Sequence, residues 1–226
     1  MFRDGCIFRG GKISVGNLLE IHKLTWPIAC AFSWLKSTCA CGSESTRMAT
    51  MTGLYSAYGV LWVLKSNTFY DIKFYLPQNY QSVTTAIINY ASISVYYLFP
   101  YLASRNCSPL TNLDLALSLF LYVVGGFLHY CADAQKFYTL KYNPNSLIVE
   151  GLFEHLQHPN YLGEFLMWLA LAIVAGKYNV WSYVPVAWLF MGTIIVGMPL
   201  KEKSMKRYDN YETWTKKTYR LIPFIW

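Results

Sequence analysis

The chain has 226 residues, of which 54% belong to the hydrophobic set and 14% are charged, and its formal net charge is +7. Soluble domains carry about 25% charged residues, so this composition predicts a membrane protein. The aromatic content of 18%, the absence of a glycine period and six scattered cysteines exclude disorder, collagen and a secreted disulfide scaffold.

The positive charge is confined to the two ends of the chain. Residues 1–48 hold six basic and three acidic residues, and residues 49–200 hold six of each. Residues 201–226 hold seven basic residues against three acidic ones. The C-terminal tail therefore carries the largest basic excess.

The N-terminal segment has no long apolar run before Trp26 and no clear small-residue cleavage site, which argues against a cleaved signal peptide. We interpret residues 1–48 as a leader or interfacial segment, and residues 49–226 as one membrane domain. The six cysteines form no Cys-x-x-Cys pair, so we expect free thiols without a metal or a disulfide.

Four apolar stretches are predicted to cross the membrane, because they approach the ~20 residues that a ~30 Å hydrocarbon core requires. They are Thr84–Ala103, Leu113–Ala132, Tyr161–Gly176 and Trp181–Leu200. Ala49–Leu64 is a fifth, shorter and uncharged stretch, and Trp26–Leu35 is short enough to be re-entrant or interfacial. The predicted fold class is an all-α polytopic membrane helix bundle of about five or six transmembrane helices.

The topology follows from the short connection at residues 177–180, which makes the last two predicted spans a hairpin. The loop at residues 133–160 then lies on the same side as the tail at residues 201–226. Because the tail is the most basic segment, the positive-inside rule assigns that side to the cytosol. We expect a cytosolic cap there that binds a soluble, charged cofactor.

Several chemistries are excluded by the motifs that the chain lacks. It has only four histidines, too few for a membrane di-iron site, and no His-Glu-x-x-His, Gly-x-Ser-x-Gly, P-loop or Gly-x-Gly-x-x-Gly pattern. We therefore expect no metal and no nucleic-acid partner. Gly125 and Gly126 lie within an apolar span, where close helix packing explains them.

The most unusual element runs from Gly151 to Glu164 and leads directly into an apolar helix. Pro159 suits the first turn of a helix, so His158 and Asn160 are predicted at the helix N-terminus. Glu164 follows about one turn later, where a carboxylate either snorkels to the headgroups or meets a polar partner inside the bundle. We favour the polar partner.

Two further polar clusters are predicted on the cytosolic side. Asp133 and Lys136 share a face if their helix continues, with Lys141 beyond them; ordinary juxtamembrane charge is the alternative. The tail either faces lipid headgroups or binds phosphates through its cations while tyrosine rings stack on a base. The tail candidates are Lys201, Glu202, Lys203, Arg207, Tyr208 and Tyr211.

These motifs together resemble the C-terminal region of steroid 5α-reductases and the related sterol and enoyl reductases. The resemblance covers about residues 113–226, and its motifs are Asp133-Ala134-Gln135-Lys136, Gly151-Leu152-Phe153, His158 to Glu164, and Ile222-Pro223-Phe224-Ile225. It implies an endoplasmic-reticulum membrane reductase that uses NADPH to reduce a carbon–carbon double bond of a lipid, steroid-like or enone substrate. Cofactor contacts implied by motif position are Asp133, Asn160, Glu164 and Tyr208 or Tyr211. His129 stands where the steroid reductases commonly have an Asn.

The leading hypothesis is hydride transfer from NADPH, with the nicotinamide near Glu164 and the phosphates on Lys136, Lys201, Lys203 or Arg207. The wider predicted cofactor site adds Lys141, His158, Tyr161 and Glu202. Tyr96 or Tyr97 is the candidate proton donor, and a core aromatic role is the alternative reading of either residue.

Two rival functions come from other classes. Isoprenylcysteine carboxyl methyltransferases share the His-Pro-x-Tyr-x-Gly element and bind S-adenosylmethionine, which Glu164 and Glu202 would hold through its ribose and ammonium groups. The second rival is a non-catalytic, sterol- or lipid-binding membrane protein that keeps the fold without the chemistry.

Overall fold

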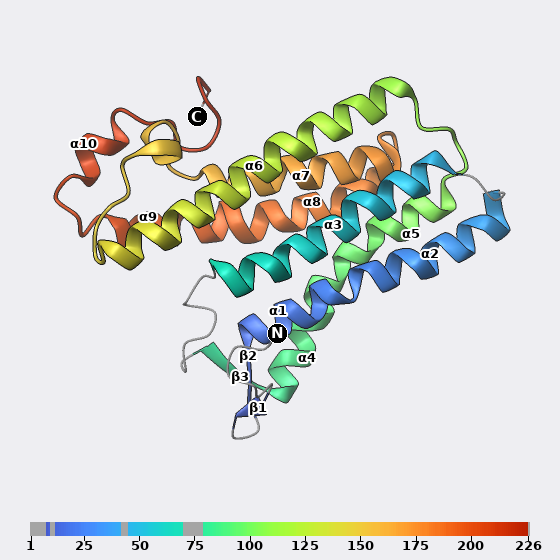
Figure 1. Cartoon of the computed structure of the whole chain (residues 1–226), viewed down its shortest axis with the longest axis horizontal. Coiled ribbons are helices and arrows are strands. Elements are labelled where there is room, and N and C mark those ends of the chain that lie inside the picture. The colour runs from blue at the N-terminus through green and yellow to red at the C-terminus, as the bar shows by residue number, and fades with distance from the viewer. Residues whose placement is uncertain (1–7, 10–11, 42–44, 70–78, 226) are drawn as a thin grey trace. The chain divides into compact units, whose positions relative to one another are not determined.

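The computed structural model describes residues 8–9, 12–41, 45–69 and 79–225, and helices dominate them (Figure 1). The chain divides into two compact units. The first contains the described residues up to Leu115 together with Leu171–Ser182, and the second contains Ala116–Ala170 together with the described part of Tyr183–Trp226.

The first unit begins with a small antiparallel sheet that the sequence did not reveal. Its strands are β1 (Phe8–Arg9), β2 (Lys12–Ser14) and β3 (Tyr80–Ser82), in the order β1-β2-β3, with Ile13 opposite Gln81. Strands of two or three residues are too short for the alternation of polar and apolar residues that marks a strand. The sheet places the start of α1 (Val15–Leu24) beside the start of α4 (Val83–Ile93).

Serine side chains define three helix starts in this unit. Ser14 Oγ accepts from Asn17 N at 3.0 Å at the start of α1, and Ser82 Oγ accepts from Thr85 N at 3.1 Å at the start of α4. Ser45 does the same for α3 (Thr46–Thr68). Each bond satisfies an amide that the first helical turn would leave unpaired.

The remaining helices of the first unit are α2 (Trp26–Cys41) and α5 (Leu98–Arg105), the latter joined to α4 by the 3-10 turn Ser94–Tyr97. An aromatic core holds them: the Trp26 ring stacks on Tyr55 with centroids 4.0 Å apart and planes at 2°. Gly59 lets α3 approach α1, because a Cβ there would lie 2.6 Å from the Lys23 carbonyl oxygen.

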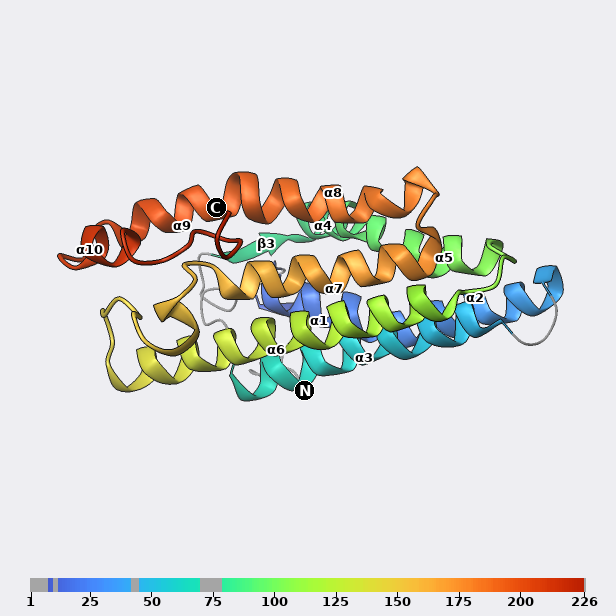
Figure 2. The ribbon, with the colours of Figure 1, turned by 90° about the horizontal axis from the view of Figure 1, so that it is seen from above.

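The second unit is built around α6 (Asn112–Tyr142) and α7 (Pro159–Gly176), which lie side by side (Figures 1 and 2). They touch at two glycines: a Cβ on Gly163 would lie 2.4 Å from both the Gly125 carbonyl oxygen and the His129 amide nitrogen. This confirms the close packing predicted for Gly125. Gly126 is not needed for it, since its Cβ would meet only Met167 Sδ at 3.8 Å.

The rest of the second unit completes the bundle and covers one end of it. The chain continues through the 3-10 turns at Gly151–Glu154 and Val180–Tyr183, then α8 (Val184–Leu189), a π-helical stretch at Phe190–Gly197, α9 (Met198–Met205) and α10 (Tyr211–Thr215). α10 lies at the same end as the connection between α6 and α7 (Figure 1). The Trp214 indole N–H donates to the Phe153 carbonyl at 2.7 Å and ties the two segments together.

In the described residues, four helices are long and apolar enough to cross a membrane, so the protein is an integral membrane protein. They are Val83–Arg105, Asn112–Tyr142, Pro159–Gly176 and Val180–Met205. Each contains one predicted span, and the all-α membrane bundle is confirmed. The predicted fifth span, Ala49–Leu64, lies within α3, which is not among the four.

The N-terminal segment, expected to be a leader or interfacial, is folded where the structure describes it. It contains β1, β2, α1 and α2, and β2 pairs with β3 from far along the chain. The expectation of free thiols holds for Cys30 and Cys131 and is wrong for Cys107, which is disulfide-bonded. Spacing along the chain cannot reveal which distant cysteines the fold brings together.

Candidate functional site

The start of α7 carries the most densely connected polar side chains of the second unit. The helix begins at Pro159, as predicted. His158, just before it, is fully buried, and its Nε2 donates to Glu202 Oε1 at 3.0 Å. The Tyr161 ring stacks on the imidazole with centroids 5.5 Å apart and planes at 8°.

Glu202 is held from a second direction by Arg220 of the C-terminal tail. Arg220 Nε donates to Glu202 Oε1 at 2.8 Å, and Arg220 Nη2 donates to Oε2 at 3.1 Å. This bidentate pair orients the carboxylate that His158 contacts. Arg220 was not predicted as a site residue, because nothing in the sequence of the tail distinguishes it from the other basic residues there.

The His158 side chain is neutral at physiological pH. Its burial, together with the nearby Lys201 ammonium, lowers its pKa to about 4, although the hydrogen bond to Glu202 acts in the opposite direction. A neutral imidazole that donates from Nε2 has an acceptor at Nδ1. In the described part of the chain this buried Nδ1 has no hydrogen-bond partner.

A second polar cluster joins the first turn of α7 to α6. Asn160 Nδ2 donates to Asp133 Oδ1 at 3.2 Å, and His129 Nδ1 donates to the Asn160 carbonyl oxygen at 3.2 Å. The Asn160 Oδ1 atom is buried and, among the described residues, accepts no hydrogen bond. Asp133 and Asn160, two of the predicted cofactor contacts, are therefore hydrogen-bonded to each other, and His129 anchors the same turn.

Tyr130 is a further member of this cluster that the sequence analysis missed. Its hydroxyl is buried and has no hydrogen-bond partner in the part of the chain that the structure describes. The carboxylates of Glu164 and Asp133 both act on it electrostatically. Only the packing of α6 against α7 brings Tyr130 beside Glu164. Because an apolar span contains many aromatic residues that only pack, the sequence does not single out Tyr130.

Buried polar atoms in native structures rarely lack a hydrogen-bond partner, and those that do call for an explanation. His158 Nδ1 lies just before α7, Asn160 Oδ1 in its first turn, and the Tyr130 hydroxyl on α6. The two acceptors can each bond to a bound molecule that carries its own N–H or O–H donors. A ribose or a carboxamide has such donors.

The predicted cations of the tail contribute unequally. Lys201 Nζ lies 4.9 Å from the Tyr161 ring centroid, within the His158 cluster. Tyr211 lies close to Glu202. Its burial and, to a smaller extent, the Glu202 carboxylate raise the pKa of the Tyr211 hydroxyl. Arg207 and Lys203 are exposed, and Arg207 Nη2 donates to the Tyr208 hydroxyl at 2.8 Å.

On α6, Lys136 is half-buried one turn after Asp133, because the helix continues well beyond Ala132. Lys141 is exposed near the end of the helix, where its Nζ lies 5.4 Å from the neighbouring Tyr142 ring. Of the lysines predicted in the cofactor site, Lys201 therefore lies beside Tyr161 in the His158 cluster, whereas Lys141 is exposed near the end of α6.

Part of the recognised motif serves to build the loop between α6 and α7. Gln135 Nε2 donates to the Glu150 carbonyl at 2.7 Å, and its Oε1 accepts from Leu152 N at 3.2 Å. Gly151 has φ of +59°, and a Cβ there would lie 2.7 Å from the Gln135 amide. Glycine suits this position for both its backbone conformation and its lack of a side chain.

The candidate proton donors Tyr96 and Tyr97 belong to the first unit. The Tyr97 hydroxyl is hydrogen-bonded to Thr25 Oγ1 and lies 3.2 Å from the Tyr90 hydroxyl. His22 is fully buried 5.1 Å from the Tyr97 ring, and neither of its nitrogens has a partner in the described residues. Tyr96 is more buried, and its ring lies 6.4 Å from Trp26.

The fold and the site define a class: an integral membrane helix bundle with a buried polar site and cations at one end of two packed helices. The family described as "Protein of unknown function (DUF1295)" matches residues 62–218, and the chain belongs to that family. The chain is also 26% identical over 136 residues to 3-oxo-5-alpha-steroid 4-dehydrogenase 2 of Sus scrofa.

That alignment covers 58% of this chain and 50% of the relative, so the chain spans about half the length of this curated relative. The predicted resemblance to steroid 5α-reductases is confirmed. No group of three or more His, Cys, Asp or Glu side chains that could hold a metal ion is found within the described ranges.

Proposed function

We propose that the protein is a membrane-embedded reductase that uses NADPH to reduce a carbon–carbon double bond conjugated to a carbonyl, in a lipid or steroid-like substrate. The observation that carries the proposal is the pair of buried acceptors without partners, His158 Nδ1 and Asn160 Oδ1. The similarity to a steroid dehydrogenase supports the same class of reaction.

The residues at the start of α7 fit a nicotinamide nucleotide. Ribose hydroxyls and the carboxamide N–H₂ are donors, and the two acceptors without partners would receive them. The Lys201 ammonium lies beside the same turn, so it is suited to a cofactor phosphate, and Arg207 and Lys203 extend the positive charge into the tail. Bound there, NADPH supplies a hydride to the β-carbon of the substrate.

The chain's own side chains have three tasks in this proposal. Asp133 and His129 hold the Asn160 turn, and the Glu202–Arg220 pair fixes the orientation of His158. Glu164, half-buried in α7, acts electrostatically on Tyr130 of α6, and in this proposal its carboxylate lies beside the nicotinamide. The apolar surroundings exclude water, which strengthens each electrostatic contact.

The proton that completes the reduction comes from Tyr97 in this proposal. Its hydroxyl already has a hydrogen-bonded neighbour on each side, Thr25 and Tyr90, so it can give up a proton and have it replaced. Tyr96 is the less suitable candidate, because it is more buried within the aromatic core.

We further propose an endoplasmic-reticulum location with the tail in the cytosol. The basic excess of residues 201–226 supports this orientation. It puts the connection that contains Cys107 on the opposite side, and a disulfide suits the oxidising lumen of that compartment.

Methyl transfer from S-adenosylmethionine is the alternative from another enzyme class. It would require Glu202 to bind a ligand ammonium or ribose hydroxyl. Both oxygens of Glu202 already accept hydrogen bonds from Arg220, and His158 adds a third, which weighs against that use. The lipid-binding alternative does not account for the buried acceptors without partners.

Thermal unfolding of the purified protein in detergent tests the proposal against both rivals. We expect NADPH to raise the melting temperature by several degrees, NADH to do so less, and S-adenosylmethionine to have no effect. Stabilisation by S-adenosylmethionine alone would contradict the reductase proposal, and no shift with any of them would favour the lipid-binding protein. NADPH-dependent saturation of a lipid extract would identify the substrate.

Glu164→Gln should weaken NADPH binding about three- to thirtyfold if the carboxylate lies beside the cofactor. Glu150→Gln is the matched control, since the Glu150 side chain is exposed and only its carbonyl is used. Equal NADPH affinity in both variants would remove Glu164 from the site.

A further inference from the structure

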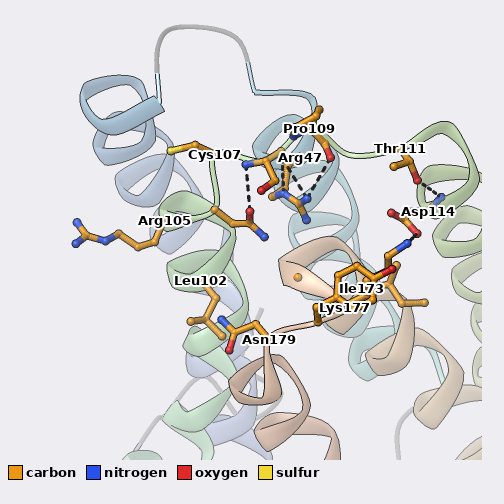
Figure 3. Close-up of a pocket in the computed structure, with 14 residues that line it drawn as sticks. Arg47, Leu102, Arg105, Cys107, Pro109, Thr111, Asp114, Ile173, Lys177 and Asn179 are labelled. Atoms are coloured by element: carbon orange, nitrogen blue, oxygen red, sulfur yellow. Dashed lines mark hydrogen bonds and ion pairs between the residues drawn. The ribbon is translucent and has the colours of Figure 1, made fainter.

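A cavity of about 750 Å³ in the first unit belongs to no part of the site described above. It lies at the end of α7, where that helix meets the connection between α5 and α6 (Figure 3). Helix α7 has 18 residues, so its C-terminal end is about 25 Å from the turn that carries His158. The cavity therefore lies at the C-terminal end of a helix that is long and apolar enough to cross a membrane.

Its most informative lining residue is Arg47, a cation that is only 6% exposed. Nε and Nη2 donate to the Ser108 carbonyl at 3.2 and 3.1 Å, and Nη1 donates to the Val174 carbonyl. These acceptors are neutral. In the described part of the chain, no carboxylate lies within ion-pair distance of the guanidinium.

A buried guanidinium is normally balanced by a carboxylate or a bound anion, because removing a lone charge from water is costly. The partial negative charge at the C-terminal end of α7 offsets part of the Arg47 charge, and the Asp114 carboxylate acts on it without forming an ion pair. Asp114 is the one carboxylate among the described residues that line the cavity, and it is bonded to Lys177 at 2.8 Å. Figure 3 shows Lys177 turned toward Asp114 and away from Arg47.

The edge of the cavity adds more positive charge. Arg105 extends from the end of α5, exposed and directed away from Arg47 (Figure 3). Among the described lining residues Lys177 is paired to Asp114, so the two arginines leave an excess of two positive charges. Leu102 and Ile173, from two membrane-spanning helices, supply an apolar wall.

We propose that this cavity binds an anionic phosphate group, with Arg47 at its inner end and Arg105 at its edge. The volume is that of a site for a whole small molecule and far exceeds a phosphate ion. The apolar wall, and the position of the cavity at the end of a helix that can cross a membrane, suit the phosphodiester of a lipid headgroup. Free phosphate shares the chemistry that the arginines recognise, so the experiment must separate the two sources.

The test uses the full chain, purified in detergent and depleted of lipid, with the melting temperature as the readout. The probes are phosphatidylglycerol, phosphatidylcholine and inorganic phosphate, with chloride at matched ionic strength. We expect saturable stabilisation of about 5 °C by phosphatidylglycerol. A comparable shift with inorganic phosphate would also support the site and identify the ligand as a free phosphate group. Equal shifts with phosphatidylcholine and phosphatidylglycerol, or none with any probe, would overturn the proposal.

Variants connect the effect to the cavity. Arg105→Gln should weaken the binding of phosphatidylglycerol about three- to tenfold, and Asp114→Asn should strengthen it by a similar factor, because a carboxylate that lines the cavity is lost. Lys12→Gln removes an exposed cation from β2 and should change nothing.

Arg47→Gln should abolish the effect; if that variant does not fold, the opposite responses of the other two still decide the question. Identical affinities in Arg105→Gln, Asp114→Asn and Lys12→Gln would show that the cavity does not select an anion.

Discussion

His158 combines complete burial with contacts to charged neighbours. It donates to Glu202, stacks on Tyr161 and lies near Lys201, yet its remaining nitrogen has no partner in the described residues. A neutral histidine in this position serves both as an anchor for the tail and as an acceptor for a ligand. Its protonation would place a second cation beside Lys201.

The stability of the protein should therefore fall on acidification. The unfolded chain takes up a proton at His158 near pH 6.5, and the folded protein does so only near pH 4, because burial lowers the pKa to about 4. Between these values the unfolded state binds more protons, so the free energy of unfolding decreases as the pH drops from about 6.5 to 4, by at most about 3 kcal/mol from this residue.

Melting temperatures of the wild type and His158→Gln between pH 7.5 and 4.5 measure this effect. The wild type should lose more stability than the variant, and the other buried histidines contribute equally to both proteins. Parallel curves would mean that His158 does not titrate in this window.

Tyr97→Phe tests the proposed proton donor. The loss of the hydroxyl should reduce the rate of NADPH-dependent reduction by about 10²- to 10⁴-fold and leave the affinity for NADPH unchanged. Single-turnover kinetics and cofactor titration separate these two quantities. Tyr96→Phe is the control, and an equal loss of rate in that variant would argue against assigning the proton to Tyr97.

At the level of the elements, the contact between α6 and α7 positions the candidate site. The Gly125–Gly163 crossing brings the backbones together one turn from His129, and this places Asp133 opposite Asn160. The loop after α6 is then held by Gln135 and Trp214, which fixes the start of α7. The polar residues meet because two helices without side chains at their crossing can approach closely.

Gly163→Ala should disrupt this crossing. The added Cβ would lie 2.4 Å from backbone atoms of α6, which cannot move without separating the helices. We expect a loss of about 1–3 kcal/mol or more in stability, with weaker NADPH binding, measured by thermal unfolding in detergent.

Gly126→Ala is the matched control, because its Cβ makes only an ordinary contact with Met167. This variant should be neutral or slightly stabilising. If both variants melted at the same temperature, the helices would not be held at Gly163.

At the scale of the whole molecule, the two ends of the spanning helices differ in chemistry. The first turn of α7 and the part of α6 that faces it carry the His158 and Asp133 clusters, and the last turn of α7 lines the Arg47 cavity together with the disulfide-bonded Cys107. This polarity matches a protein that meets a soluble cofactor on one side of a membrane.

Labelling with a membrane-impermeant maleimide tests the orientation. In cells whose plasma membrane alone is permeabilised, Asp209→Cys should be labelled, because we place the tail in the cytosol, and Tyr178→Cys should be labelled only after the internal membranes are opened. Both positions are exposed. The parent chain supplies the background from its own cysteines. The reverse pattern would invert the proposed topology.

Much of the helical bundle could be predicted from the sequence, because hydropathy and helix starts are local properties. The four predicted spans each lie within an observed helix, and Pro159 begins α7 as its missing N–H predicts. The predicted bounds were too short for α6, which has 31 residues and continues through polar sequence. Hydropathy detects where a helix enters lipid and not where it ends in water.

The candidate site was only partly predictable. Asp133, His158 and Asn160 were predicted from the motifs, and Lys201 and Glu202 from the polar tail. The structure brings each of them into the two clusters. Arg220 and Tyr130 were missed, because one is a tail cation among several and the other an aromatic residue in an apolar span. Arg220 binds Glu202, which lies 18 residues away along the chain, and Tyr130 is influenced by Glu164 from the neighbouring helix.

The sequence by itself determined that this is a basic, helical membrane protein whose C-terminal motifs resemble those of steroid 5α-reductases. Only the tertiary structure decided that Cys107 is disulfide-bonded, and which polar atoms of the described residues remain without partners. It also decided that Arg47 lies buried beside a cavity, with no described carboxylate in contact. The physical reason is that burial and hydrogen bonding depend on neighbours from distant parts of the chain, whereas hydropathy and helix capping depend on residues a few positions apart.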